Sequence, residues 1–300
     1  MNSWVYINHE NINREKYQAC IERNKCTSLY AQDFVWDCLH PGWDILIMGD
    51  YEKIIPLPFK SAYGFATQRQ PLFIRTTPLI GPFSENEKTH LLDILNEQTS
   101  LIELNFSSQF KDAGEAKGRY QYIDLPGEYE MQRKLYSTNA KRILKRSFED
   151  CKRVESTDIK SFIDFFKENV GIKHSKISEK SYKYLSLLLE KTIKMGIGKL
   201  HVVSGAEGPL CMAFFVDFKG TRYYLKGASN SKARESGVMF YLIDWAIKDA
   251  IDHGLKTFDF VGANNENIAT FNKKFGAVDG TYSVIKSNNL FWPLNKLVTV

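Results

Sequence analysis

Apolar residues along the second half of the chain alternate or recur at helical spacing, and this pattern predicts a run of strands and helices. Residues 199–203, 209–218 and 221–227 are rich in β-branched and aromatic residues and are separated by glycine-containing turns, which predicts a three-stranded meander. Residues 236–253 carry apolar side chains at helical spacing, and 257–261 has the composition of a buried strand. We expect strand 257–261 to lie beside strand 221–227 in one sheet.

The stretch 258–277, FDFVGANNENIATFNKKFGA, predicts a strand, a break and a short helix. Asn264, Asn265 and Asn267 stand where a helix needs an N-cap. The apolar residues that follow recur at helical spacing, and Gly276 is placed to end the helix.

The first half shows a fainter copy of the same pattern. Residues 43–48 and 52–59 predict a hairpin around a Gly-Asp turn, and 71–75 is expected to add a strand. A helix over 85–98 and a strand over 101–106 follow. Sequence identity between the halves is negligible, so the repeat is one of pattern, and two similarly folded halves are expected.

Composition narrows the class of protein without choosing a function. The 300 residues suffice for one large domain or two ordinary ones, and 43% apolar and 25% charged residues are typical of a soluble globular protein. A net charge of +5 is compatible with phosphate-bearing ligands but does not demand DNA. Five cysteines without a C-x-x-C pair, and no apolar run of transmembrane length, predict a reduced cytoplasmic protein without a membrane span. The histidine spacing predicts no metal site.

The stretch 265–277, NENIATFNKKFGA, is similar to the N-x-x-A-x-x-x-Y-x-K-x-G-F ending of GNAT acetyltransferases. Its pairing with FDFVGA resembles the FemAB-type branch of that superfamily, which comprises peptidoglycan aminoacyltransferases and relatives with a BioF2-like acetyltransferase domain. The strand 122–125, the basic helix 139–146 and the end of the meander at 224–227 also match, so the resemblance is strongest over residues 120–286.

The resemblance implies an α/β fold of two tandem GNAT-like domains, in which mixed sheets are flanked by helices. The N-terminal domain, residues 1–126, would be degenerate, and the C-terminal domain, 127–300, would hold the donor site, with the boundary near Pro126-Gly127. The implied activity is transfer of an acyl group other than an aminoacyl group from acyl-CoA directly to an amine, without a covalent enzyme intermediate. Acyl-CoA would be a co-substrate rather than a permanently bound cofactor, and the acceptor would be a small-molecule or peptide amine.

A CoA pyrophosphate is expected at the start of the long helix, where unpaired N–H groups and the helix dipole favour an anion. GNAT proteins place R/Q-x-x-G-x-G/A before this helix, and the aligned residues here begin at Arg234 and include Ser236, Gly237 and Val238. Arg234 could bind a phosphate bidentately, and Gly237 permits close approach of the backbone. Met239 stands in place of the last small residue. The alternative is a surface loop that leads into a helix capped by Ser236.

Acyl transfer to an amine needs a deprotonated nitrogen, a stabilised oxyanion and an acid for the leaving group. Many GNAT enzymes carry a tyrosine acid on the last helix, where this chain has Asn272. Lys273 and Lys274 follow, as a lysine does in FemAB-type proteins, and either stabilise negative charge or are solvated. Asp259 is either a general base whose pKa is raised by burial or, as we favour, a structural carboxylate that caps a loop.

Tyr224 and Lys226 are expected to bind the substrate and Asn264 to line the donor site, because all three stand at predicted strand ends. Two alternatives to acyl-CoA-dependent transfer stay open. A FemX-like enzyme would use aminoacyl-tRNA on a cell-wall precursor, with tRNA as the second choice of donor. A non-catalytic GNAT-fold binding protein would explain the missing tyrosine and the degenerate phosphate loop.

Overall fold

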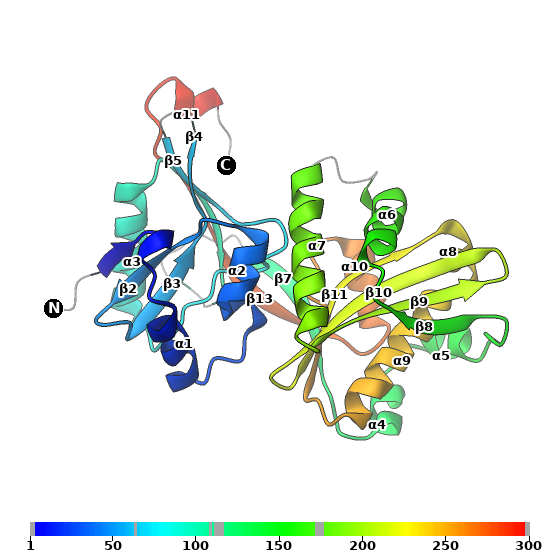
Figure 1. Cartoon of the computed structure of the whole chain (residues 1–300). Helices are drawn as coiled ribbons and strands as arrows, with labels where there is room; N and C mark the ends of the chain where they lie inside the picture. Colours follow the sequence, from blue (N-terminus) through cyan, green and yellow to red (C-terminus); the bar gives the residue numbers. More distant parts are fainter. Residues whose placement is uncertain (1–3, 63–64, 108–109, 111–116, 172–176, 298–300) are drawn as a thin grey trace. The chain divides into compact units, whose positions relative to one another are not determined.

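The computed structural model describes residues 4–62, 65–107, 110, 117–171 and 177–297 (Figure 1). They belong to two compact units, Met1–Gly118 with Thr281–Val300 and Arg119–Gly280. The chain enters the second unit within strand β7 (Lys117–Asp124) and returns to the first within β13 (Val278–Asn288). The two compact units meet at residues 118/119 and 280/281. The boundary expected near Pro126-Gly127, between two GNAT-like domains, stays a prediction. Among the described residues, no helix is both long enough and apolar enough to cross a bilayer.

The first unit begins with an antiparallel sheet in the order β1 (Trp4–Ile7), β2 (Asp44–Met48), β3 (Lys53–Leu57). Strands β2 and β3 form the hairpin expected around the Gly-Asp turn, where Gly49 takes a φ of 63° that favours glycine. Its other elements include the helices α1 (Arg14–Arg23), α2 (Asp33–Leu39) and α11 (Leu294–Leu297) and the 3-10 turns His9–Asn11 and Leu29–Ala31.

A second group of strands in this unit runs β4 (Phe59–Ala62), β5 (Phe65–Arg69), β6 (Leu101–Phe106) and β13. The parallel pair β5 and β6 is connected through helix α3 (Glu85–Gln98), which begins in a capping box between Ser84 and Glu87. Helix α3 buries Leu91 and Leu95 against the sheet, as its spacing predicts.

The prediction of a strand over residues 71–75 is wrong. Pro71 has no N–H to give to a ladder, and its carbonyl instead accepts a turn bond from Ile74 N–H at 3.1 Å. The segment therefore forms a turn between β5 and α3.

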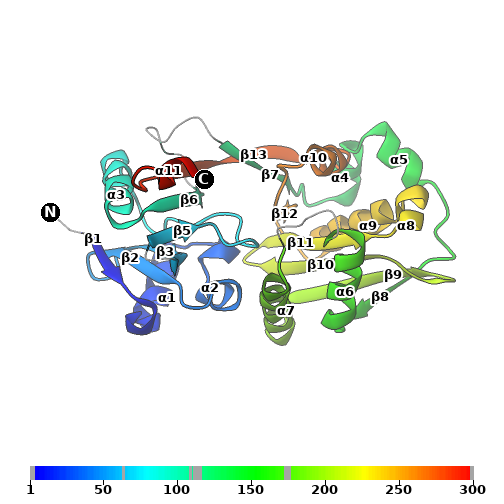
Figure 2. The same ribbon diagram turned by 90° about the horizontal axis from the view of Figure 1, so that it is seen from above.

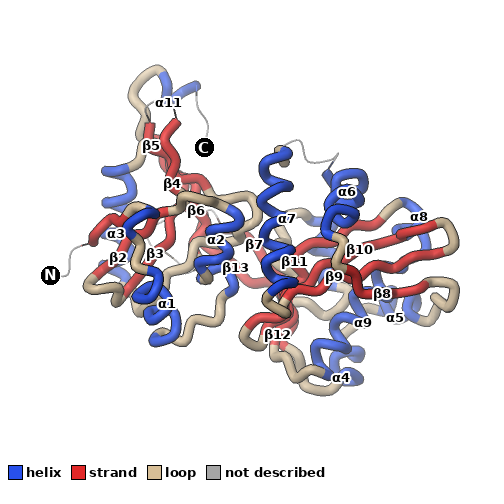
Figure 3. Tube along the Cα trace, in the orientation of Figure 1, coloured by secondary structure: helices blue, strands red, loops and turns tan. Residues whose placement is uncertain are grey.

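The strands of the second unit form one mixed sheet (Figure 3). All neighbours in it are antiparallel except β11 and β12. Its order is β7, β12 (Thr257–Asp259), β11 (Thr221–Ser229), β10 (Gly208–Phe218), β9 (Gly198–Gly205), β8 (Lys152–Ser156). The predicted meander is confirmed as β9, β10 and β11. The predicted neighbourhood of strands 257–261 and 221–227 is also confirmed, although β12 ends at Asp259.

Helices cover both faces of this sheet (Figure 2). Phe214 and Phe215 are consecutive in β10 and so point to opposite faces. The Phe214 ring lies 6.3 Å from Phe162 of α6, whereas Phe215 belongs to the core formed with α9. The helices of this unit are α4 (Tyr129–Lys134), α5 (Thr138–Leu144), α6 (Ile159–Asn169), α7 (Glu179–Lys194), α8 (Ser231–Ser236), α9 (Val238–Asp252) and α10 (Glu266–Lys273).

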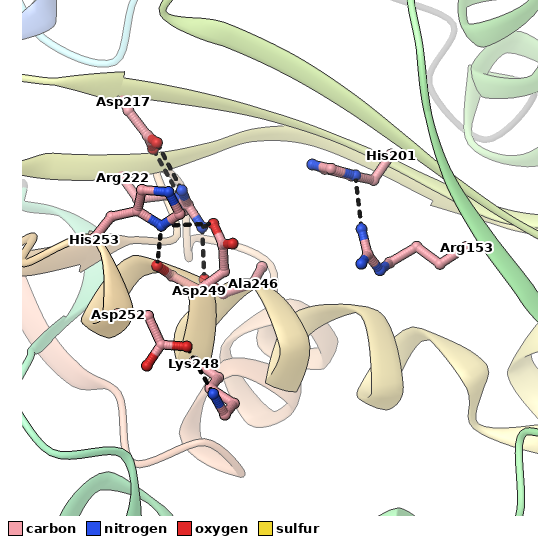
Figure 4. A network of polar contacts seen from close by, with 9 residues as sticks. All are labelled: Arg153, His201, Asp217, Arg222, Ala246, Lys248, Asp249, Asp252 and His253. Atoms are coloured by element: carbon pink, nitrogen blue, oxygen red, sulfur yellow. Dashed lines mark hydrogen bonds and ion pairs between the residues drawn. The ribbon is translucent and has the colours of Figure 1, made fainter.

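Arg222 ties strands β10 and β11 to helix α9 (Figure 4). Its side chain is only 2% exposed. Nε and Nη2 donate to the Asp217 carboxylate at 2.7 and 2.6 Å, and Nη1 donates to Asp249 Oδ2 at 2.7 Å and to the Ala246 carbonyl at 2.9 Å. These bonds fix α9 on the sheet through a single buried cation.

A second polar contact joins β8 and β9 to the same helix (Figure 4). The Arg153 guanidinium carbon lies 3.7 Å from the centroid of the Trp245 ring of α9, and Nη1 contacts His201 Nδ1 at 3.3 Å. Burial, together with the charge of Arg153, lowers the pKa of His201 to about 4. His201 is therefore neutral at pH 7.

Candidate functional site

Strands β11 and β12 pair for only three residues and then part. Their last pair is Tyr223 with Asp259, after which β11 continues to Ser229. Asp259 Oδ1 accepts the Val261 N–H at 2.7 Å, and Val261 takes a φ of 67° that ends the strand. Asp259 thus holds the loop after β12, and the structural role favoured for it over a catalytic one stays a prediction. Within the described chain, the edge of β11 on the side of β12 has no strand partner beyond Tyr223, while its other edge stays paired with β10.

A β-bulge at this point changes which way β11 side chains face. Tyr224 pairs with Phe215, but Lys226 pairs with Phe214, so Leu225 is an extra residue in β11. Paired residues share a face of the sheet, and Phe214 and Phe215 face opposite ways. Tyr224 and Lys226 therefore point to opposite faces, although their spacing in the sequence indicates one shared face.

Tyr224 faces helix α9. Its ring stacks on Phe215 with centroids 5.5 Å apart, and its hydroxyl lies 3.8 Å from Met239 Sδ. A Cβ on Gly227 would lie 1.9 Å from this hydroxyl, so glycine is required there for the ring to fit. Burial raises the pKa of Tyr224 far above its ordinary value, and the phenol stays protonated. Met239, which replaces the last small residue of the GNAT motif, thus contacts Tyr224, a residue expected to bind the substrate.

Lys226 lies on the face covered by α6 and α7 and is half-buried. Burial lowers its pKa to about 8. A fraction of this amine is therefore uncharged near neutral pH, unlike an ordinary surface lysine.

The long helix expected from Ser236 to His253 is confirmed as α9, which begins at Val238, and a separate short helix, α8, precedes it across Gly237. Gly237 takes a φ of 80°, which ends α8 and prevents a continuous helix. Asn230, not Ser236, supplies a capping side chain here, because its Oδ1 accepts the Ala233 N–H of α8 at 2.8 Å. The expectation that Ser236 caps the long helix is corrected: it is the last residue of α8.

The start of α9 is packed against helix α5. A Cβ on Gly237 would lie 2.7 Å from Ile143 Cγ2, and Val238 is fully buried. The Ser236 carbonyl accepts from Arg146 Nη1 at 3.0 Å, and the Ser229 carbonyl accepts from Arg234 Nη1. Arg234 itself is exposed on α8. The structure therefore brings the four expected pyrophosphate residues together, with a side chain of α5 beside the glycine.

The loop before α10 is tied to strand β7. Asn264 Oδ1 accepts the Arg119 N–H at 2.8 Å, and the Arg119 guanidinium donates to the Ala263 carbonyl at 3.0 Å and to Glu266 at 2.6 Å. Asn265 is the N-cap of α10. Arg119 could not be predicted from the sequence, because its partners lie about 145 residues away and no local spacing marks it.

Three consecutive residues at the C-terminal end of α10 lie in different environments. Asn272 is 1% exposed. Lys273 Nζ forms an ion pair with Asp279 Oδ2 at 2.8 Å, and this bond is the main cause of a lowered pKa at Asp279. Lys274 Nζ lies 5.5 Å from the centroid of the Phe240 ring of α9. The two lysines are thus held by different partners rather than placed together.

Comparisons with known proteins give a family match within the second unit and several similar folds. Residues 132–267 match the acetyltransferase (GNAT) domain family, whereas no curated protein sequence matches the chain significantly. The crystal structure of FemX is 13% identical, has a TM-score of 0.67 and covers 99% of both chains. A tandem GNAT protein from the clavulanic acid biosynthesis pathway is 9% identical, has a TM-score of 0.59 and covers 94% of this chain and 97% of its own.

A third solved structure, the N-myristoyltransferase of Saccharomyces cerevisiae with bound myristoyl-CoA, is 12% identical, with a TM-score of 0.54 over 96% of this chain and 81% of that one. The match over residues 132–267 confirms the expected resemblance to GNAT acetyltransferases, and FemX and the tandem GNAT protein share the fold of this chain. The α/β fold with mixed sheets flanked by helices is confirmed as well.

Proposed function

We propose that this chain, whose residues 132–267 form a GNAT acetyltransferase domain, transfers an acyl group directly from an activated donor to an amine. The observation that carries the proposal is the parting of β11 and β12 after Tyr223 and Asp259, inside the matched residues. The edge of β11 from Tyr224 to Ser229 offers backbone groups to an extended ligand, which can add to a strand edge through main-chain hydrogen bonds. The amide-bearing arm of acyl-CoA has the chemistry for such an edge.

In the proposed step, the nitrogen of a neutral amine attacks the carbonyl carbon of the donor. The C–N bond forms and the C–S bond of the thioester breaks, while the amine loses one proton and the leaving thiolate takes up one. Lys226 is proposed to contact the acceptor, and Tyr224 and Asn264 to flank the donor. Lys273 and Lys274 are the candidates for stabilising the oxyanion.

Acyl-CoA is the first donor that we propose. The myristoyl-CoA bound to a protein of the same fold supports this choice. Arg234, exposed on α8, would pair with the pyrophosphate through a charge-assisted bond. Ser236, Gly237 and Val238 would supply the backbone at the start of α9.

Aminoacyl-tRNA is the second candidate, and the packing of Ile143 against Gly237 favours it. That contact covers the glycine at which the backbone would approach a pyrophosphate. Helix α5 and the residues after it also expose three cations, Arg142, Lys145 and Arg146, which suit a polyanionic backbone. The FemX fold, which covers 99% of both chains, is consistent with this alternative.

Thermal shift assays on the full chain distinguish these donors. A ligand that binds only the folded state stabilises it by RT ln(1 + [L]/Kd), so acetyl-CoA or a longer acyl-CoA should raise the melting temperature. S-acetylpantetheine, which lacks the pyrophosphate, should also raise it if the edge of β11 carries binding. The same assay is run with aminoacyl-tRNA and with deacylated tRNA, to test the second candidate donor.

Mass spectrometry of ligands that co-purify with the chain supplies candidate acceptors for a transfer assay. Amide product formed from acyl-CoA supports the first proposal, and product formed only from aminoacyl-tRNA supports the second. Binding of a donor without any product would favour the non-catalytic GNAT-fold protein. If no donor binds, direct acyl transfer by this chain is refuted.

A further inference from the structure

Two consecutive aromatic side chains just after β13 are largely exposed to solvent. Phe291 is 63% exposed and Trp292 is 72% exposed. Both belong to the first unit, and they lie outside the residues matched by the GNAT domain family. Large aromatic side chains are mostly buried in folded proteins, so two neighbouring exposed ones, here called the aromatic pair, point to a contact with another surface.

Hydrogen bonds on both sides hold the backbone that carries the aromatic pair. Before the pair, Asn289 Nδ2 donates to the carbonyl of Asn96, near the end of α3, at 3.1 Å. Asn288 Nδ2 donates to the Asn295 carbonyl, also at 3.1 Å, and the Asn295 N–H donates to the Phe291 carbonyl at 3.2 Å. The two rings are therefore presented to solvent by a fixed turn.

A third aromatic ring extends this surface. The Phe65 ring at the start of β5 lies 6.0 Å from the Phe291 ring. Phe65 is itself partly exposed, and Figure 1 shows α11 beside β4 and β5 at one end of the first unit. The three rings therefore form one apolar patch, shared by the β4–β5 pair and the turn before α11.

The charges around this patch are mainly positive. Lys60 of β4 and Lys296 of α11 are exposed. Strands β4 and β5 and residues 288–297 contain no aspartate or glutamate. The exposed Glu97 lies on α3, outside these segments. A surface that meets the patch is therefore expected to be negatively charged.

The small size of the patch favours a lipid bilayer over a protein partner. Two aromatic side chains can bury at most about 500 Å², whereas each partner in a standard protein interface buries about 800 Å². Binding to a bilayer requires no matched area of that size, because its strength rises with the apolar area that enters the lipid and with the attraction to anionic headgroups.

We propose that the aromatic pair docks the first unit on the surface of a bilayer that contains anionic phospholipid. Phe291 and Trp292 would enter the boundary between headgroups and acyl chains, where aromatic side chains are favoured. Lys60 and Lys296 would stay among the headgroups and attract their phosphates. This contact needs no membrane-spanning helix and neither acyl donor nor acceptor, so its test is independent of the proposed transfer.

Co-sedimentation of the full chain with lipid vesicles measures this docking. Vesicles of phosphatidylglycerol and phosphatidylcholine in equal parts should bind the chain, and pure phosphatidylcholine vesicles should bind it more weakly because they carry no net negative charge. Phe291→Ser combined with Trp292→Ser should weaken binding to the anionic vesicles roughly 10-fold or more. Lys60→Gln combined with Lys296→Gln should weaken it roughly 5-fold for each lysine.

Tryptophan fluorescence shows whether the aromatic pair enters the bilayer. Brominated acyl chains quench a tryptophan that inserts among them, and the chain has five tryptophans. Trp292→Phe should keep most of the binding but remove the quenching. The matched control is Val5→Ser, because Val5 is a 47% exposed apolar residue on β1 of the same unit, and this change should leave binding unaltered.

All the changed side chains are exposed, so the variants should keep the melting temperature of the wild type. The proposal is overturned if the chain does not bind anionic vesicles, if the double serine variant binds as tightly as the wild type, or if Val5→Ser weakens binding equally. Gel filtration at several concentrations tests a second copy of this chain as the occupant. Self-association that the double serine variant abolishes, without any vesicle binding, would also overturn it.

Discussion

Replacing Arg222 by alanine should destabilise the second unit by about 3–5 kcal/mol, because it leaves two carboxylates without their shared cation. Burial lowers the pKa of Arg222, but its bonds to Asp217 and Asp249 outweigh burial and raise it, so the group stays charged. The two carboxylate side chains are 25% and 22% exposed, so water can partly solvate them once the cation is gone. We therefore expect the lower end of this range, about 3 kcal/mol.

Hydrogen exchange measured by mass spectrometry reports the loss in free energy of unfolding for each unit separately. A loss of about 3 kcal/mol corresponds to roughly 100-fold faster exchange for amides that exchange by unfolding of the second unit. Peptides from β10, β11 and α9 should show this acceleration. Peptides from β2 and β3 in the first unit are the internal reference.

Two control variants separate a buried charge effect from a general loss of contacts. Lys248→Ala removes an exposed ion pair with Asp252 on the same helix and should cost far less than Arg222→Ala, because water screens and solvates both charges. Arg222→Met combined with Asp217→Asn and Asp249→Asn removes all three charges, and it should cost less than Arg222→Ala because no unpaired charge remains. The reasoning fails if Arg222→Ala costs no more than Lys248→Ala, or if the triple variant is the least stable.

Three further predictions concern single positions. Gly237→Ala should cost about 1–3 kcal/mol in chemical denaturation, because its φ of 80° is unfavourable for alanine and the new Cβ would lie 2.7 Å from Ile143 Cγ2. An equal cost in an Ile143→Ala background would contradict that contact. His201 has a folded pKa of about 4, below its ordinary 6.5, so the unfolded state takes up the proton first and stability falls by about 3 kcal/mol as the pH drops through this window. His201→Gln should flatten this loss in urea unfolding at several pH values, and an unchanged slope would refute the assignment. Arg234→Ala should weaken acetyl-CoA binding roughly 10- to 100-fold in calorimetry and leave S-acetylpantetheine unaffected, whereas equal affinity for acetyl-CoA would exclude Arg234 from the donor site.

The elements that sequence reasoning predicted are those that local signals define. The meander was recognisable because glycine-containing turns separate its strands, and α10 because Asn265 caps its start, although the helix ends at Lys273, three residues before Gly276. Helix α8 was not predicted, because its six residues are too few and too polar to show a helical pattern of apolar positions. The left-handed backbone at Gly237, against Ile143, separates it from α9.

Features of the candidate site that depend on distant partners could not be predicted. The face of the sheet to which Lys226 points depends on how β11 pairs with β10, and the extra residue Leu225 in β11 shifts that pairing by one position. The ion pair between Arg119 and Glu266 joins residues far apart in the chain, and neither residue type nor spacing indicates it. Hydrophobic periodicity thus predicted which residues form strands, but not how one strand is offset against the next.

The return of the chain to the first unit through β13 has a consequence for biosynthesis. Residues 119–280 form a continuous insertion, whereas β6 gains its antiparallel neighbour β13 only after that insertion has been made. We therefore expect residues 119–280 to complete their fold on the ribosome before the first unit does. Until β13 is synthesised, one edge of the largely apolar strand β6 stays unpaired, and such an edge promotes aggregation. Limited proteolysis of stalled nascent chains would reveal this order, and protection of residues 101–106 before β13 emerges would contradict it.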